Sequence, residues 1–547
     1  GSGDDGVASD ASQINVQPRD ALKDGGELKL PIGPIPTNWN PMHVDGNLVD
    51  NNDIMGFTMP ALWKYNPDAT TEPNEDYLTD FEVKDADGDD PMVVTLHLNP
   101  EAKWNDGTPI TYKDFDAPFK ACNGENTTDD VDDEEAQKTM FVCASSDGWR
   151  EIEKIEQGEA ESDVVVTFKT SYPDWTGVLL TPYHAEGMKD AETFNKGWIV
   201  DVPNNDWMAG PFKFESVDQS QKRVYLVPNE NWWGNEPILD KVTFNSLEAD
   251  AQANSFANGE IDVLPYIIDA STYQTVTGRE DAEVRVATGR QWRHYTFNSN
   301  VGLIQDQTIR QAIAMGLNRE QTTKSDLAGL PVDPEKVLLG NHFFMPGQEG
   351  YADNSDVTPY DPEQAGKLLD EAGWTLEDGK EFRTNEAGEE LAVNYLVITG
   401  VSTSENEGKM LQDQMKAIGI NVKMVQASPN EFFSKVASGE FEITTFTWQG
   451  TPYPMANVGQ IYGDGSSSNY ANLKIDKVEE LIPQIASEMD NDKRIELTNE
   501  ADRAIWEAVH TVPIYQRLEL TAVPKNLANY GAFGFASGKP EDIGYMK

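Results

Sequence analysis

The chain has 547 residues, enough for about two to four domains of ordinary size. It carries 94 Asp and Glu against 42 Lys and Arg, and this net charge of −52 repels nucleic acid and anionic lipid headgroups, which excludes both as partners. With 13 Trp, 18 Tyr and 21 Phe it can bury a large core, whereas no apolar run approaches the ~18 residues of a transmembrane helix.

Residues 1–27 are rich in Gly, Ser, Asp and Ala, lack periodicity, and are predicted to form a flexible acidic leader. The dipeptide Gly1-Ser2 is typical of an expression remnant, and the missing initiator Met indicates that a targeting segment has been removed. Such a leader fits a tether outside the cytosol, and it fits a trimmed cytosolic protein equally well.

The first predicted elements after the leader are strands. Residues 28–35 open with an alternating run, and residues 92–98 are rich in β-branched side chains. The first strand leads into a loop with an aromatic and several polar groups, at Trp39, Asn40, Met42 and His43. The second leads into Asp106-Gly107, a tight-turn signal.

The two cysteines, Cys122 and Cys143, flank an acidic and loop-like segment. A disulfide that closes this loop is predicted, and it would contribute about 3 kcal/mol in the loop-entropy description. Two cysteines without a neighbouring histidine are too few for a structural zinc site. The disulfide implies an oxidising compartment outside the cytosol.

Helices followed by a glycine and a strand recur along the chain, at residues 257–263 and 437–443. In the second half, a helix starts at Asp361-Pro362 and ends at Gly373. Another apolar stripe over 411–418 closes at Gly419 and leads into a strand. This alternation predicts two α/β lobes, with a β-rich insertion near 61–195.

The stretch 446–457 begins as an apolar strand and breaks at Gly450 into a loop with two prolines. Strand ends on α/β scaffolds often carry binding sites, and clefts between lobes bind small ligands. We therefore expect a site here. The alternative interpretation is a core strand followed by an ordinary turn.

Catalytic signatures are absent from the sequence. It contains no Walker A motif, no Gly-x-Ser-x-Gly elbow and no His-Glu-x-x-His, and its six histidines show no metal spacing. With 94 acids, carboxylate pairing carries no information. No enzyme activity, cofactor or metal is predicted.

Five blocks in order resemble the family 5 extracellular solute-binding proteins of ABC importers, which include dipeptide-, oligopeptide- and nickel-binding proteins. The block KWNDGTPITYKDF, ending at Phe115, is similar to the family signature DGxPxTAxDV. The others are MAGPFKF (208–214), NENWWG (229–234), RQAIAMGLNR (310–319) and DPEQAGKLLDEAGW (361–374).

The resemblance implies an α/β, bilobal periplasmic-binding-protein-like fold with two mixed-sheet lobes. Two crossovers, at 292–298 and 511–515, would join the lobes, and an extra β-rich subdomain would belong to the first lobe. The predicted boundaries are 1–27 for the leader, 28–60 with 196–290 and 512–547 for the lobe I core, 61–195 for the inserted subdomain, and 291–511 for lobe II.

The resemblance also implies a non-catalytic receptor that captures a peptide, here an oligopeptide, in the interlobe cleft and delivers it to an ABC importer permease. The receptor would be a monomer, either periplasmic or lipid-anchored on the outer face of the cytoplasmic membrane. Its leader would be the spacer behind a lipidated cysteine.

In peptide-binding members, the strand and loop that match 446–453 contribute to the site, and several place an Asp just beyond. This chain has no carboxylate there. The predicted ligand-binding residues are Trp39, Asn40, Met42, His43, Met208, Trp292, Trp448, Gln449, Gly450, Thr451 and Tyr453.

Three further functions stay open beside the peptide receptor. Trp39, Trp292 and Trp448 offer stacking faces for an oligosaccharide, the main alternative. A nickel or metallophore receptor is disfavoured because the loop holds no histidine or acid cluster. A hydrolase or adhesin that uses the cleft is the alternative from another class.

Overall fold

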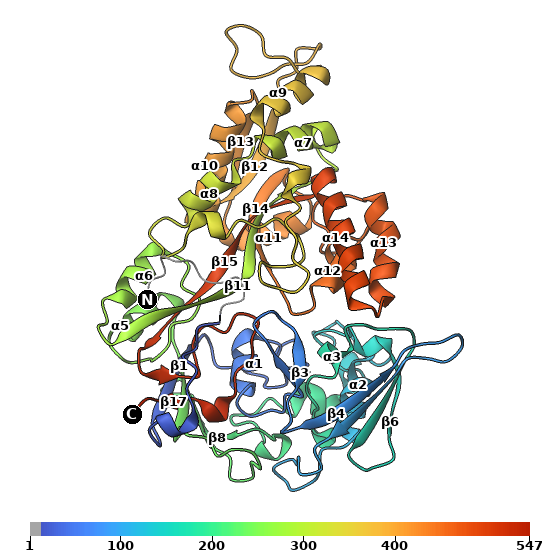
Figure 1. The fold of residues 1–547 in the computed structure, drawn as a ribbon, viewed down its shortest axis with the longest axis vertical. Helices are drawn as coiled ribbons and strands as arrows, with labels where there is room; N and C mark the ends of the chain where they lie inside the picture. The colour runs from blue at the N-terminus through green and yellow to red at the C-terminus, as the bar shows by residue number, and fades with distance from the viewer. Residues whose placement is uncertain (1–11) are drawn as a thin grey trace. The chain divides into compact units, whose positions relative to one another are not determined.

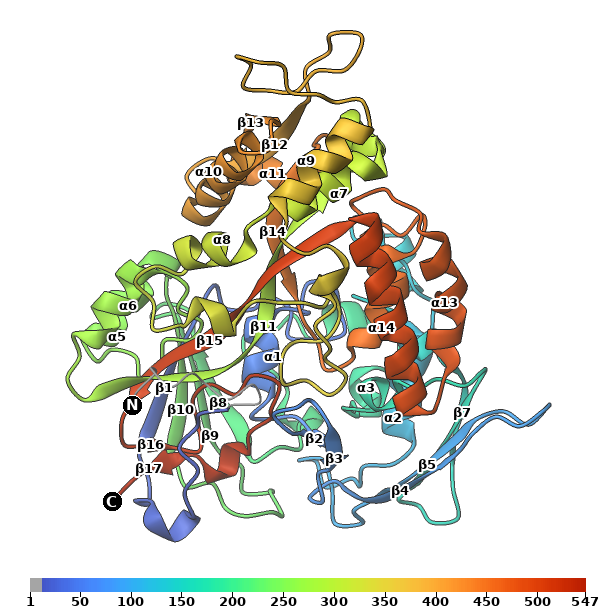
Figure 2. The ribbon, with the colours of Figure 1, turned by 45° about the horizontal axis from the view of Figure 1, so that its top comes forward.

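The computed structural model describes residues 12–547, which divide into two units (Figures 1 and 2). Within this range, unit 1 comprises 268–270 and 287–519, and unit 2 comprises 12–267, 271–286 and 520–547. The long strands β11 (Ala282–Phe297) and β15 (Thr511–Pro524) each contribute residues to both units. The predicted mixed α/β fold with two lobes is confirmed; the division within β11 lies N-terminal to the predicted crossover segment 292–298.

Unit 2 contains a four-stranded sheet of order β1-β10-β9-β8. Its strands are β1 (Glu27–Ile32), β8 (Phe212–Asp218), β9 (Arg223–Pro228) and β10 (Lys241–Ser246). Alternate residues of β1 are buried, among them Leu28 and Leu30, as the period of a strand with one covered face requires. The helices of this unit are α1 (Val49–Met55), α2 (Lys113–Cys122), α3 (Trp175–Val178), α4 (Ala191–Lys196), α5 (Gln252–Ala257) and most of α6 (Ala270–Thr277).

The second sheet of unit 2 is antiparallel throughout and has the order β4-β5-β7-β6. It is built from β4 (Leu78–Lys84), β5 (Val93–Leu98), β6 (Ile152–Gln157) and β7 (Asp163–Phe168). The short ribbon of β2 (Trp63–Tyr65) with β3 (Thr71–Pro73) contacts β4. A second ribbon, β16 (Leu527–Ala528) with β17 (Gly544–Tyr545), lies beside β1 instead (Figure 1). The β-rich segment expected near 61–195 is thus a sheet of its own.

Cys122 at the end of α2 and Cys143 form a disulfide across 21 positions of sequence, as the acidic loop between them predicts. The backbone on either side of Cys143 pairs with the loop that follows β1. Ala144 donates to the carbonyl of Met42 at 2.8 Å, and Val44 donates to that of Val142 at 3.2 Å. The disulfide therefore anchors the loop around His43 to α2.

We expect the double variant Cys122→Ser/Cys143→Ser to unfold with about 3 kcal/mol less free energy than the parent, because an open loop regains chain entropy in the unfolded state. Urea denaturation followed by tryptophan fluorescence measures this difference. Reduction of the parent protein should lower its stability by a similar amount and leave the double variant unaffected. Equal stability of oxidised and reduced parent would contradict the prediction.

Residues 12–26 do not form the free leader that their composition predicts. Gln13 donates its backbone N–H to Val286, and Lys23 donates to Tyr545. The guanidinium of Arg19 pairs with Asp542 at 2.6 Å. Backbone pairing and one ion pair hold this polar segment to β11 and to the C-terminal part of unit 2, and composition indicates neither contact. Residues 1–11 of the predicted leader lie outside the described residues.

Unit 1 is organised around a five-stranded sheet of order β13-β12-β14-β11-β15. Besides β11 and β15 it contains β12 (Ala392–Ile398), β13 (Asn421–Ala427) and β14 (Ile443–Gln449). Strand β12 runs parallel to both β13 and β14, whereas β11 runs antiparallel to β14. The predicted helix–glycine–strand alternation produces the parallel part of this sheet.

Helices of unit 1 pack on the sheet and beside it. They are α7 (Gln307–Gly316), α8 (Arg319–Asp326), α9 (Pro362–Glu371), α10 (Ser402–Lys416), α11 (Pro429–Ala437), α12 (Asn457–Tyr462), α13 (Asp476–Ser487) and α14 (Asn491–Ala508). Asp361 caps α9 by accepting from the N–H of Gln364, as predicted. Figures 1 and 2 show α13 and α14 side by side. In the part of the chain that the structure describes, we find no helix with the length and apolarity needed to span a bilayer.

Candidate functional site

The predicted site begins where strand β14 ends. The β-branched and aromatic run from Ile443 to Trp448 favours a strand, which closes at Gln449. The next N–H, that of Gly450, donates to the carbonyl of Arg290. A Cβ at Gly450 would lie 2.7 Å from that oxygen, so only glycine allows this close approach.

Aromatic rings cover one face of the paired strands β11 and β14. Trp292 is opposite Trp448 in the register, and His294 is opposite Phe446. The imidazole of His294 lies with its centroid 4.4 Å from that of Phe446 and 4.9 Å from that of Trp292. We call Trp292, His294, Phe446, Trp448 and Tyr470 the aromatic face.

Trp448 stacks with two other rings. Its ring is nearly parallel to that of His294, with centroids 6.0 Å apart, and to that of Tyr470, with centroids 5.8 Å apart. Tyr470 comes from the loop after α12 and also contacts Phe446 at 5.8 Å. The stack fixes the orientation of the Trp448 indole, which is only half-buried.

Polar groups without an internal partner lie at this strand end, where Trp292 is only 3% exposed and Trp448 is half-buried. Neither indole N–H of Trp292 and Trp448 has a hydrogen-bond partner among residues 12–547. Gln449 is exposed, and its amide also lacks a partner within the described chain. Two fixed N–H donors and one amide therefore border an apolar surface, the combination found in small-molecule sites.

The loop beyond Gly450 is held from within unit 1. Thr451 accepts from the N–H of Tyr453 at 3.1 Å through its hydroxyl. Its carbonyl accepts from the amide of Gln348, also at 3.1 Å. These bonds give the loop a fixed course from the strand end to the buried Met455.

The opposite face of the same strands contains a buried ion pair. The guanidinium of Arg293 pairs with Glu407 of α10, with Nε 3.1 Å from Oε2 and Nη2 close to Oε1. Both side chains are buried. Arg293 also donates to the hydroxyls of Thr445 and Thr447, at 3.2 and 3.0 Å. Through these hydrogen bonds the ion pair is tied to β14, on the side opposite the aromatic face.

A second acid completes this cluster. Asp326, at the end of α8, accepts from the Asn406 amide at 2.8 Å and from the Tyr515 hydroxyl at 3.0 Å. Burial beside the Glu407 carboxylate raises the pKa of Asp326 to about 9, whereas Arg293 lowers the pKa of Glu407 against the effect of burial. At neutral pH, Asp326 therefore holds a proton, which it donates to Glu407.

His294 is a neutral member of the aromatic face. Burial lowers its pKa well below the ordinary value, and the nearby charge of Arg293 acts in the same direction. Nδ1 lies 2.9 Å from the Thr296 hydroxyl, whereas the buried Nε2 has no partner within the described chain. The aromatic face thus carries no charge from this imidazole.

The other five predicted site residues belong to unit 2, and most of their side chains are engaged in its interior. The indole of Trp39 donates to the Val200 carbonyl at 3.0 Å, and the amide of Asn40 donates to that of Phe194 at 3.0 Å. His43 accepts from the N–H of Asp45. Met208 is fully buried, and Met42 is half-buried.

The structure brings Trp292, Trp448, Gln449, Gly450 and Thr451 together at one strand end of unit 1. Sequence reasoning missed His294 and Tyr470. The period of two along β11 places His294 on the same face as Trp292, so the strand pattern carried a signal for it. Tyr470 had no local signal, because its position depends on the path of the loop after α12.

A scan against family models matches residues 78–470 to the bacterial extracellular solute-binding proteins, family 5. The oligopeptide-binding protein OppA of Mycobacterium tuberculosis is 33% identical over 98% of this chain and 87% of its own length. The chain belongs to the family 5 extracellular solute-binding proteins, which confirms the resemblance carried by the five sequence blocks.

Solved structures share the fold. A periplasmic EDTA-binding protein, EppA, matches with a TM-score of 0.84 and 24% identity, covering 98% of this chain and 99% of its own. The oligopeptide-binding protein AppA from Bacillus subtilis, in complex with a nonapeptide, matches with a TM-score of 0.69 and 18% identity, covering 96% and 100%. At these identities the likeness supports the fold alone.

Proposed function

We propose that this protein is an oligopeptide receptor that captures its ligand on the aromatic face and delivers it to the permease of an ABC importer. Its membership of the family and its similarity to OppA along nearly the whole chain support this function. The observation that carries the proposal is the pair of partner-free indole N–H groups, on Trp292 and Trp448, beside an apolar surface.

An extended peptide supplies hydrogen-bond acceptors for these N–H donors and apolar groups for the surface beside them. Its backbone carbonyls accept from the two indoles and from the amide of Gln449, and its apolar side chains cover Trp448 and Tyr470. The N–H of Gly450 does not take part, because it is bonded to Arg290. The ligand is thereby recognised through its backbone, which permits many sequences.

The loop 450–457 contains no carboxylate to hold the α-ammonium of a peptide. A buried ammonium without an anion is costly, so the ligand's amino terminus remains in water or is absent. This favours an oligopeptide over a dipeptide.

The unit 2 residues Trp39, Asn40, Met42, His43 and Met208 take a supporting part in this proposal. Trp39, Asn40 and His43 hold the loop after β1 by hydrogen bonds within unit 2. A direct contact of these five residues with the ligand stays a prediction. The interlobe position of the ligand and the predicted domain boundaries stay predictions, as do the lipid anchor, the monomeric state and the lack of enzyme activity.

Calorimetry with defined peptide and oligosaccharide pools tests the function. We expect heat from peptides of several residues and none from sugars. If only sugars bind, the protein is an oligosaccharide receptor and the peptide-receptor proposal is wrong. Mass spectrometry of the bound ligand after incubation tests the absence of turnover, and a cleaved product would contradict it.

The variant Trp448→Ala should weaken peptide binding by more than about 1 kcal/mol, because truncated aromatic anchors typically cost that much. Trp448→Phe is the matched control: it keeps a ring in the stack and removes the N–H donor. We expect calorimetry to rank its affinity between the parent and Trp448→Ala. Unchanged affinity in a folded Trp448→Ala variant would make the strand purely structural.

A further inference from the structure

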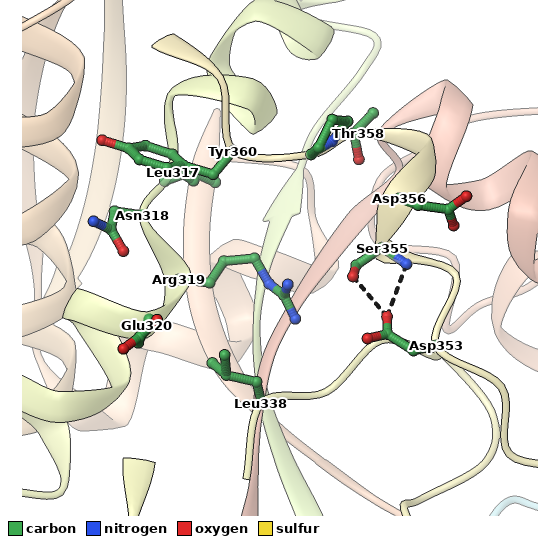
Figure 3. A pocket seen from close by; sticks show the side chains of 11 residues that line it. Leu317, Asn318, Arg319, Glu320, Leu338, Asp353, Ser355, Asp356, Thr358 and Tyr360 are labelled. Atoms are coloured by element: carbon green, nitrogen blue, oxygen red, sulfur yellow. Dashed lines mark hydrogen bonds between the residues drawn. The ribbon is translucent and has the colours of Figure 1, made fainter. Parts of the chain in front are cut away.

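Unit 1 contains a cavity of about 350 Å³ that is separate from the aromatic face in the residues that line it (Figure 3). Its walls come from the turn between α7 and α8, from Leu338, and from the irregular segment 353–360. None of these residues belongs to the aromatic face, and the inference below does not depend on the proposed function.

A cationic group with spare donors lies in this cavity. Arg319 donates from Nε to the Pro513 carbonyl at 2.7 Å and from Nη2 to the Leu339 carbonyl. Its Nη1 has no hydrogen-bond partner, and no carboxylate lies within ion-pair distance, among residues 12–547. Figure 3 shows the guanidinium reaching toward the middle of the pocket. The guanidinium also lies over the Trp506 ring, with Cζ 5.3 Å from the ring centroid. A guanidinium that is held by two carbonyls and a ring, with a donor to spare, attracts a carboxylate.

The hydroxyl of Thr358 is a second unsatisfied group. Thr358 is 8% exposed, and its Oγ1 has no partner within the described chain. Leaving a buried hydroxyl unpaired costs free energy in the empty protein. A ligand in this cavity would remove that cost by accepting the hydroxyl proton.

An anionic group faces Arg319 across the cavity. The Oδ1 atom of Asp353 accepts from the N–H and hydroxyl of Ser355, at 3.0 and 2.6 Å, as the dashed lines of Figure 3 mark. Its Oδ2 has no hydrogen-bond partner among the described residues. One side of the cavity thus offers a cationic hydrogen-bond donor, Arg319, and the other side an anionic acceptor, Asp353.

We propose that this cavity binds a small zwitterion of the α-amino-acid class. The ligand's carboxylate accepts from Arg319 and Thr358, its ammonium donates to Asp353, and an aliphatic side chain lies against Leu317 and Leu338. Inorganic anions fit less well, because Asp353, Asp356 and Glu320 surround the cavity and the whole chain carries a charge of −52.

Ligand-observed NMR titration of the full chain tests the proposal with three probes of one skeleton. L-Leucine carries both charges, 4-methylpentanoate (leucine without its amino group) only the carboxylate, and isoamylamine (leucine without its carboxylate) only the ammonium. We expect binding of L-leucine at millimolar concentration and at least about tenfold weaker binding of either half, since each charged contact is worth that factor or more. Equal binding of 4-methylpentanoate would overturn the zwitterionic class.

Two variants locate the bound L-leucine. Thr358→Val preserves shape and removes a hydroxyl that bonds nothing in the protein, so its melting temperature should not fall. Asp353→Asn removes the negative charge. Each should weaken L-leucine binding by about fivefold or more. Arg319 is left intact because it also ties the Pro513 and Leu339 carbonyls together.

The variant Trp448→Ala separates this cavity from the aromatic face. We expect it to bind L-leucine as the parent does. Loss of L-leucine binding in Trp448→Ala with retention in Thr358→Val and Asp353→Asn would place the amino acid on the aromatic face and overturn the proposal. Absence of L-leucine binding to the parent would overturn it as well.

Discussion

The variant Glu407→Gln should unfold with up to about 3–5 kcal/mol less free energy than the parent, because Arg293 loses its ionised partner and the buried Asp326 has to give up its proton to replace it. The pair lies inside unit 1, with the Glu407 side chain fully covered. Loss of the pair also frees Arg293 from the geometry in which it donates to Thr445 and Thr447 of β14. Chemical denaturation, followed by fluorescence and circular dichroism together, measures the change.

Asp413→Asn is the matched control for this variant. Asp413 lies on the same helix, α10, but its side chain is exposed. Its replacement should change the free energy of unfolding by less than about 0.5 kcal/mol. A Glu407→Gln variant as stable as Asp413→Asn would show that the buried pair contributes nothing beyond its own desolvation.

The variant Asp326→Asn should gain stability relative to the parent as the pH rises from about 4 to about 9. The native state raises the pKa of Asp326 to about 9, so the carboxyl holds a proton that the unfolded chain releases near its ordinary value. The parent therefore loses up to about 1.4 kcal/mol per pH unit across this window. Below this pH window Asp326 is protonated in both the native and the unfolded state, so its titration no longer affects stability. Asparagine does not titrate, so the variant lacks this pH dependence.

Denaturation curves at several pH values, with parent and variant in the same buffers, give the difference directly. Asp413→Asn should follow the parent at every pH. A constant difference between the parent and Asp326→Asn would mean that Asp326 is ionised in the native protein. The cluster would then hold two carboxylates, of Asp326 and Glu407, against the one guanidinium of Arg293.

The sequence predicted the elements whose signals are local. The helix from Asp361-Pro362 to Gly373 and the strand that breaks at Gly450 both follow from periodicity and capping. The family blocks predicted the mixed α/β fold of two lobes. The positions of the two cysteines at the ends of one acidic loop predicted a disulfide between them, and the structure confirms it.

The rest depended on contacts between distant segments. Arg293 and Glu407 are 114 positions apart, and nothing near either residue indicates an ion pair. Trp39, Asn40 and His43 have the composition of a binding loop, yet their side chains satisfy the interior of unit 2. Residue type predicted polar side chains at these positions. Which of them are hydrogen-bonded inside the protein, and which stay free for a ligand, depends on contacts between distant segments.

Two buried imidazoles of unit 1, those of His294 and His510, have a consequence for acidic surroundings. Burial keeps the pKa of His294 well below its ordinary value and lowers that of His510 to about 3. A drop from pH 7 to pH 5 therefore adds no positive charge at either ring. Acidification of the medium to pH 5 therefore does not weaken ligand binding through these two rings. A release of the ligand at low pH would have to depend on other groups.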